Sequence, residues 1–155
     1  RLDEAPAFMR GFVQNIILRR AVPFTGTAGV QFVSLTPERV EVRLANEHRV
    51  RNHIGSVHAS AMNLLAETAT GMAVGMNVRN DCLPLAKELS MAFKKRATGA
   101  LKAVATLTAE QRAAMQASDK GEVQVKVTVT DETGVEPVEC AFTWAWVPSS
   151  RPAKN

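Results

Sequence analysis

The stretch that decides the fold is "NHIGSVHASAMNLLAETATG", residues 52–71. Small and apolar residues dominate it, and Glu67 is the only formally charged residue between Arg51 and Arg79. Because apolar positions occur on most sides of a helical wheel, the sequence predicts a buried helix from about Val57 to Asn77. A glutamate is uncommon in such a helix unless it has a partner or a role. This helix is therefore the expected centre of the fold, and Glu67 is its first candidate functional residue.

The polar residues of the predicted helix gather in one narrow stripe. At 3.6 residues per turn, the stripe consists of Ser56, Ser60, Asn63, Glu67 and Thr70. Two interpretations are open. In one, the stripe faces solvent, or Asn63 and Thr70 satisfy a tolerated glutamate. In the other, the carboxylate of Glu67 lies at a pocket and acts as a base or a nucleophile.

The start of this helix is a second candidate feature. Ser56 precedes it and is the expected N-cap. The backbone N–H groups of residues 57–59 then lie at the positive end of the helix, where they could hold an oxyanion. His58 is either a hydrogen-bonding residue of the helix start or an acid–base group paired with a carboxylate of a second subunit. Within one helix it cannot reach Glu67, because nine residues span about 13 Å.

The rest of the chain predicts two helices and about six strands. Apolar residues recur every four positions within the N-terminal segment 1–20, which indicates a packing helix, and a capping-box pair, Thr108 and Gln111, begins a short surface helix. Alternating apolar and polar residues mark the strands at 28–35, 38–45, 87–95, 100–108, 122–129 and 139–147. The expected fold class is α+β, with a curved antiparallel sheet wrapped around the apolar helix. Residues 1–155 form a single domain in this prediction, with a mobile tail at 148–155.

Composition and charge exclude several classes of function. The net charge of +4 and pI of about 9.4 allow a polyanionic partner, but the absence of Tyr, an aromatic content of 5% and the lack of a nucleic-acid-binding motif argue against nucleic acid. No apolar run reaches the roughly 20 residues of a membrane helix, so we expect no membrane partner. The first residues lack a signal-peptide pattern and the two cysteines lie far apart, which favours a cytoplasmic protein with free thiols. The three histidines do not have metal-ligand spacing, so no metal site is expected.

Residues 52–71 resemble the signature of the hotdog-fold thioesterases of the phenylacetate-pathway (PaaI-like) type, which reads Asn, a Gly, His-Gly-Gly and then Leu-Ala-(Asp/Glu)-x-Ala. The acidic residue follows the histidine by nine positions here as well. The later run "KELSMAFKKRATGALKAVATL", residues 87–107, resembles the strand pair of those enzymes, and the similarity covers about residues 28–147. Within hotdog proteins the chain looks most similar to an uncharacterised branch marked by "N-H-x-x-x-V-H-A-x-A".

The resemblance implies a hotdog fold and an acyl-coenzyme A thioesterase that works as a homodimer or homotetramer, with each site lined by two subunits. It implies Glu67 as the catalytic carboxylate, the Ala59 amide as the donor to the thioester carbonyl, and Asn52 as the residue that positions substrate or water. The substrate would be an acyl-coenzyme A or another acyl thioester, with coenzyme A as part of the substrate and no separate cofactor. The substrate-binding residues implied are His58, Ser60, Asn63, Thr70, Lys94, Lys95 and Arg96.

The chain departs from the family pattern at two places. Ala59 and Ser60 replace the Gly pair, so side chains stand where the backbone usually approaches the acyl group closely. Arg96 replaces a proline, and Lys94, Lys95 and Arg96 form a basic strand end that either receives the phosphates of coenzyme A or is only solvated. A non-catalytic hotdog module that binds acyl groups or serves in assembly is therefore the alternative function.

Overall fold

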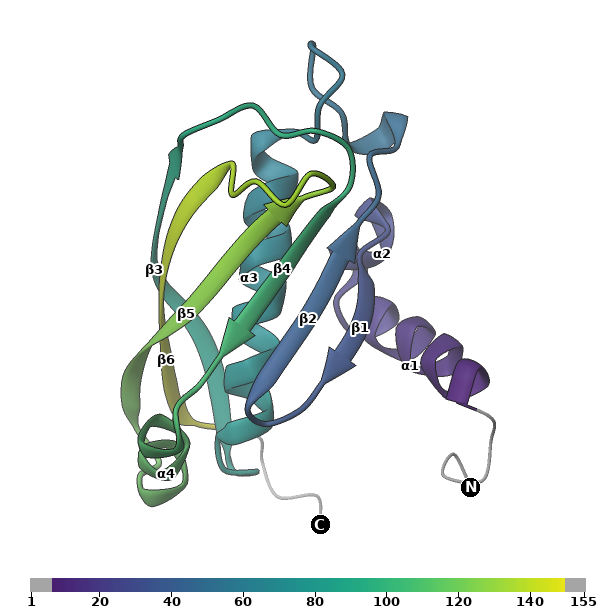
Figure 1. Ribbon diagram of the computed structural model, residues 1–155. Helices are drawn as coiled ribbons and strands as arrows, with labels where there is room; N and C mark the ends of the chain where they lie inside the picture. The colour runs from purple at the N-terminus through teal and green to yellow at the C-terminus, as the bar shows by residue number, and fades with distance from the viewer. Residues whose placement is uncertain (1–6, 150–155) are drawn as a thin grey trace.

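The computed structural model describes residues 7–149, and its elements are labelled in Figure 1. In chain order they are α1 (Ala7–Ala21), α2 (Pro23–Ala28), β1 (Gln31–Leu35), β2 (Arg39–Leu44), the short 3-10 helix η2 (His48–Val50), α3 (Ala59–Asn77), β3 (Cys82–Phe93), β4 (Leu101–Thr106), α4 (Ala109–Ala117), β5 (Gly121–Asp131) and β6 (Val138–Pro148). Every strand predicted from the sequence is present. The third strand begins earlier than predicted, at Cys82 rather than near residue 87.

The six strands form one antiparallel sheet in the order β1-β2-β4-β5-β6-β3. The sheet curves around α3 (Figure 1). The alternation of apolar and polar residues along the strands explains why one face of the sheet packs on this helix. On β5, four valines point into the core, and the residues between them are polar. This is the α+β hotdog arrangement that the sequence predicts.

The long helix α3 forms the centre of the core. Ten of its 19 residues are buried, and Leu65 and Val74 have no exposed surface. Small residues let the sheet approach closely, because a Cβ atom added at Gly71 would lie 2.8 Å from the ring of Trp144. Phe142 and Trp144 of β6 are buried in the same cluster, so the aromatic face of this strand belongs to the core.

The N-terminal helices lie beside the β1 edge of the sheet (Figure 1). Asn15 fastens α1 to this edge strand, since its Oδ1 accepts the Phe32 N–H at 2.8 Å and its Nδ2 donates to the Phe32 carbonyl at 3.1 Å. Arg19 adds a bond of 2.7 Å from its Nε to the carbonyl just before β1. The apolar spacing correctly predicts a helix here. The prediction that its apolar residues pack against the core is wrong for Phe12 and Ile16, two of the residues that recur every four positions, which are 68% and 37% exposed. Polar side chains hold α1 in place instead.

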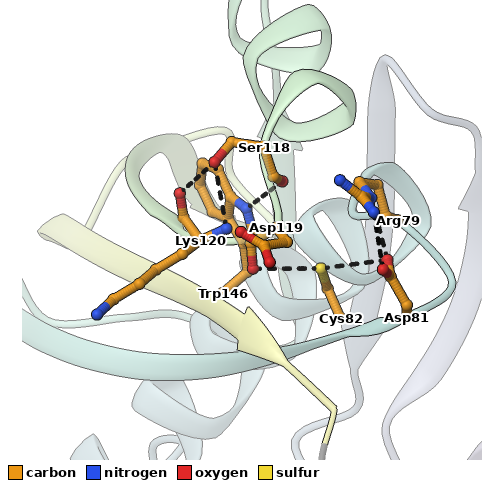
Figure 2. A network of polar contacts seen from close by, with 7 residues as sticks. All are labelled: Arg79, Asp81, Cys82, Ser118, Asp119, Lys120 and Trp146. Atoms are coloured by element: carbon orange, nitrogen blue, oxygen red, sulfur yellow. Dashed lines mark hydrogen bonds and ion pairs between the residues drawn. The ribbon is translucent and has the colours of Figure 1, made fainter.

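The end of the sheet opposite the start of α3 is held by the contacts drawn in Figure 2. Arg79 donates two hydrogen bonds to the Asp81 carboxylate, at 3.0 and 2.8 Å. The Cys82 thiol lies 3.4 Å from the Asp119 carbonyl, and the indole N–H of Trp146 donates to the C-cap carbonyl of α4 at 3.0 Å. These contacts tie the α3–β3 and α4–β5 connections to β6.

Cys82 and Cys140 are free thiols, as predicted. The segment 148–155, for which the sequence predicts a mobile tail, begins inside β6. Pro148 ends this strand, and the Ser149 N–H donates to the Asp81 carbonyl at 2.7 Å. Residues 150–155 lie outside the described part of the chain. Between residues 7 and 149, no helix is long and apolar enough to cross a membrane.

Candidate active site

The loop before α3, residues 52–56 and called the helix-start loop below, is shaped by the side chain of Asn52. Its Oδ1 accepts the N–H groups of Ile54 at 3.0 Å and Ser56 at 3.1 Å, and the Asn52 N–H donates to the Ser56 carbonyl at 2.8 Å. Gly55 takes a φ of +78°, which a residue with a side chain rarely adopts. The Asn52 side chain thus fixes the conformation of the loop. Its Nδ2 makes no hydrogen bond within residues 7–149.

Arg96 holds the same loop from the β3–β4 connection. Its Nε donates to the Ser56 Oγ at 3.3 Å, and its Nη2 donates to the Ile54 carbonyl at 2.8 Å. Ser56 is 6% exposed and its hydroxyl faces Arg96, not the first turn of α3. The predicted N-cap role of Ser56 is therefore wrong. Arg96, implied as a substrate contact, is placed where it positions the helix-start loop.

His58 is the N-cap of α3. Its Nδ1 accepts the Ser60 N–H at 3.0 Å, and its carbonyl accepts the N–H groups of Ala61 at 2.9 Å and Met62 at 3.0 Å. The amide of Ala59, the first residue of the helix, makes no hydrogen bond within the described residues. Of the first four helical amides, the Ala59 N–H is thus the one left to bind an oxyanion at the positive end of α3.

Glu67 lies about two turns further along α3 and borders a cavity of about 220 Å³. Its carboxylate forms no hydrogen bond or ion pair with any residue that the structure describes, so Asn63 and Thr70 do not satisfy it. The cavity lies against α3, and its lining includes one residue from each edge strand of the sheet, Phe32 of β1 and Pro84 of β3. Its apolar walls come from Leu18, Val22, Phe32, Leu64, Met72 and Trp144. A half-buried, unpartnered carboxylate beside such a cavity has the surroundings of a base or a nucleophile.

The other residues of the polar stripe lie in different surroundings. Thr70 is fully buried, and its Oγ1 accepts the indole N–H of Trp144 at 2.9 Å. The hydroxyl thus lies inside the core, and the substrate contact that the resemblance implies for Thr70 stays a prediction. Asn63, one turn before Glu67, is half-buried, and its Oδ1 has no partner among the described residues. Ser60 is exposed at the helix start.

The basic strand end implied to contact substrate does not form a single cluster. The Nζ of Lys94 lies 3.7 Å from the Glu139 carboxylate, and Arg96 is bonded to the helix-start loop. Only Lys95 among these three has no side-chain partner in the described chain. The three cations therefore have different surroundings and should not act alike.

Two arginines that the sequence analysis did not single out lie near the start of α3. Arg49 and Arg51, together with His58, line a second cavity of about 230 Å³. The Nη2 of Arg49 lies 2.9 Å from the Glu47 carboxylate. The signal was present in the sequence as the basic run "HRVR", residues 48–51, directly before the helix-start loop. No group of three or more His, Cys, Asp or Glu suited to a metal ion occurs in residues 7–149.

Ala59 and Glu67 lie eight residues apart on α3, which corresponds to a backbone rise of about 12 Å at 1.5 Å per residue. A carbonyl group at hydrogen-bond distance from the Ala59 amide would reach the Glu67 carboxylate of the same chain only through the length of that side chain and a bridging water. Two copies of the chain offer a second way to combine the two groups.

Comparison with families of known proteins identifies the chain. Residues 12–147 match the model of the domain of unknown function DUF4442. The chain belongs to the DUF4442 family. No curated protein is significantly similar to the DUF4442 chain in sequence.

Several solved structures share the fold of the DUF4442 chain. A protein of unknown function from Pseudomonas aeruginosa, described as a probable thioesterase, is 25% identical with a TM-score of 0.79, and the match covers 88% of the DUF4442 chain and 94% of that protein. A thioesterase from Haemophilus influenzae is 14% identical with a TM-score of 0.70, covering 90% and 94%. A thioesterase family protein from Silicibacter pomeroyi is 17% identical with a TM-score of 0.67, covering 90% and 100%. These likenesses confirm the predicted hotdog fold.

Proposed function

We propose that the DUF4442 chain is an acyl-coenzyme A thioesterase in which Glu67 is the catalytic carboxylate. The observation that carries the proposal is the Glu67 carboxylate, which has no partner within residues 7–149 and borders an apolar cavity of about 220 Å³ on α3. The structural neighbours described as thioesterases support the same class of reaction. The similarity of residues 52–71 to the PaaI-like enzymes supports a coenzyme A thioester as the substrate.

The active form in this proposal is a homodimer in which one subunit supplies the Ala59 amide and its partner supplies Glu67. The free edge of β3 supports this assembly. This 12-residue edge strand carries four apolar side chains that are 44–56% exposed: Leu83, Leu85, Leu89 and Phe93. Pairing of two β3 edges about a two-fold axis would satisfy their free backbone groups and cover these side chains. A homotetramer would form from two such dimers.

Hydrolysis in this site proceeds by attack of water on the thioester carbon. The Ala59 N–H donates to the carbonyl oxygen, which becomes an oxyanion as water attacks. Glu67 takes a proton from the water and passes it to the sulfur as the carbon–sulfur bond breaks, so the products are a carboxylic acid and a thiol. Attack by the Glu67 carboxylate itself on the carbonyl carbon is the other route open to this group.

The remaining site residues bind the substrate in this proposal. Asn52 and Asn63 offer the groups that have no partner in the described chain, an Nδ2 donor and an Oδ1 acceptor. His58 and Ser60 lie at the helix start, where the thioester would enter. Lys95 is the cation of the strand end that has no side-chain partner among the described residues, and we assign it to the phosphates of coenzyme A.

A non-catalytic acyl-binding module is the second candidate. The exposed side chains of Ala59 and Ser60, which replace the glycines of the related enzymes, favour it. With side chains at these positions, an acyl group could bind while its carbonyl is held away from the Ala59 amide. The two functions differ in turnover, not in fold or charge.

The variant Glu67→Gln separates the two functions. It keeps the size of the side chain but removes the base, so we expect hydrolysis to fall at least about a hundredfold. Circular dichroism and light scattering should show an unchanged fold and oligomer. Glu110→Gln, on the exposed side of α4, is the matched control and should keep wild-type turnover. Near-native turnover by Glu67→Gln would contradict the assignment. A wild-type protein inactive on short, medium, long and aromatic acyl-coenzyme A would favour the binding module.

A further inference from the structure

The cavity beside Glu67 has a second property that bears on function, besides the carboxylate in its lining. Its walls are contributed by elements far apart in sequence: Leu18 of α1, Phe32 of β1, Leu64 and Met72 of α3, and Trp144 of β6. The N-terminal helices therefore close one side of a space that α3 and the sheet would otherwise leave open. Its volume of about 220 Å³ lies below the roughly 300–1,000 Å³ of sites for drug-sized ligands.

The polar groups that line this cavity, apart from the Glu67 carboxylate, already have hydrogen-bond partners. The Thr25 Oγ1 donates to a carbonyl of the α1–α2 connection at 2.7 Å, and the Thr68 Oγ1 donates to the Leu64 carbonyl at 2.6 Å. The indole N–H of Trp144 donates to Thr70 at 2.9 Å. A ligand would therefore meet apolar walls and a single carboxylate, and a hydroxyl or charged substituent placed deep in the cavity would lose its hydration without compensation.

The walls are fixed before any ligand binds. Trp144 is held against α3 by its bond to Thr70 and by close packing on Gly71, where even a Cβ atom would come within 2.8 Å of the ring. On the opposite wall, the segment of α1 that carries Leu18 is fastened by the two bonds between Asn15 and the backbone of β1. A preformed cavity of fixed size selects ligands by length.

We propose that this cavity binds the hydrocarbon part of the acyl group and sets the preferred chain length. This inference rests on the proposed function, because Glu67 marks the thioester end of the ligand. A cavity of about 220 Å³ has room for a chain of several carbon atoms. The preferred substrate is thus a medium-length acyl thioester without hydroxyl or charged groups on the chain, and the N-terminal helices determine its length.

Substitutions at Leu18 test this proposal in two directions. Leu18→Ala enlarges the cavity and Leu18→Phe reduces it, and neither changes α3 or Glu67. In the wild-type protein, kcat/KM should rise about fourfold per methylene until the cavity is full and then fall. The optimum should move to longer chains in Leu18→Ala and to shorter chains in Leu18→Phe. Leu35→Ala, at a half-buried leucine of β1 that does not line the cavity, is the matched control and should keep the wild-type optimum.

A binding measurement separates this inference from the proposed function. Octanamide is a neutral probe whose amide can donate to Glu67 while its chain enters the cavity, and binding should change the fluorescence of Trp144. Length-dependent amide binding that Leu18→Ala shifts to longer chains, in a protein without hydrolysis, would support the cavity and refute the thioesterase. Hydrolysis with the same chain-length profile in wild type, Leu18→Ala and Leu18→Phe would overturn the cavity and leave the thioesterase standing.

Discussion

Replacing Ala59 with proline would remove one N–H group and leave the rest of the helix start intact. Ala59 is the first residue of α3, where proline is favourable because its fixed φ suits a helix and no intrahelical bond is lost. The preceding residue, His58, already has φ −63° and ψ 145°, the extended conformation that a following proline requires. The Ala59 N–H has no partner in residues 7–149, so no hydrogen bond of the fold is broken. Stability should therefore change by no more than about 1 kcal/mol.

The loss of activity in Ala59→Pro should be far larger than the change in stability. Removal of one oxyanion donor costs about 3–4 kcal/mol of transition-state stabilisation, so kcat should fall about 10²–10³-fold. Steady-state hydrolysis of an acyl-coenzyme A measures this, and urea unfolding measures stability. Ala109→Pro is the matched control, because Ala109 is the first residue of α4 and follows an extended N-cap with φ −71° and ψ 159°. A kcat for Ala59→Pro within about tenfold of wild type would refute the assignment of this amide to the oxyanion.

Four further variants test individual contacts. Thr70→Val should lower the free energy of unfolding in urea by about 1–3 kcal/mol, because the Trp144 indole N–H loses its acceptor inside the core; an unchanged midpoint would contradict this. Burial raises the pKa of Asp131, but a threonine hydroxyl and three backbone N–H groups donate to its carboxylate and hold its pKa below the usual value. The ionised Asp131 therefore stabilises the fold above about pH 4, and this stabilisation is lost as the pH falls through the lowered pKa. In Asp131→Asn, Tm should therefore decrease less between neutral and acidic pH than it does in the wild-type protein. Parallel curves of Tm against pH for the two proteins would rule this out. Lys95→Ala should raise KM for acyl-coenzyme A a few-fold at low salt and leave kcat unchanged. Arg96→Ala should instead lower kcat, because the helix-start loop loses two hydrogen bonds. The same kinetic pattern in both variants would show that the roles of the two residues do not differ.

The elements of the fold could be predicted because their signals are local. The valines of β5 alternate within one segment, and α3 is recognised by its continuous run of small and apolar residues. The isolation of Glu67 was visible in the same way, since no other formal charge occurs between Arg51 and Arg79. Local pattern also located the helix start, to within two residues of Ala59.

The features that the sequence does not reveal include contacts with partners that are distant in the chain. Ser56 is the better N-cap by residue type, but Arg96, 40 positions later, bonds to its hydroxyl, and His58 caps the helix instead. Thr70 shares the helical-wheel stripe of Glu67, yet Trp144, 74 positions later, donates to its hydroxyl inside the core. Helical periodicity describes which residues share a face. It does not describe which side chain from another element lies against that face.

The combination of Ala59 and Glu67 from two subunits is tested most directly by the activity of a mixed dimer. Chains carrying Glu67→Gln and Ala59→Pro, each inactive as a homodimer, would be co-expressed with different tags and the mixed dimer purified. One of its two sites then contains an intact Ala59 amide from one chain and an intact Glu67 from the other. We predict that the mixed dimer hydrolyses acyl-coenzyme A at about half the wild-type rate. A mixed dimer as inactive as its two parents would contradict a site shared between subunits.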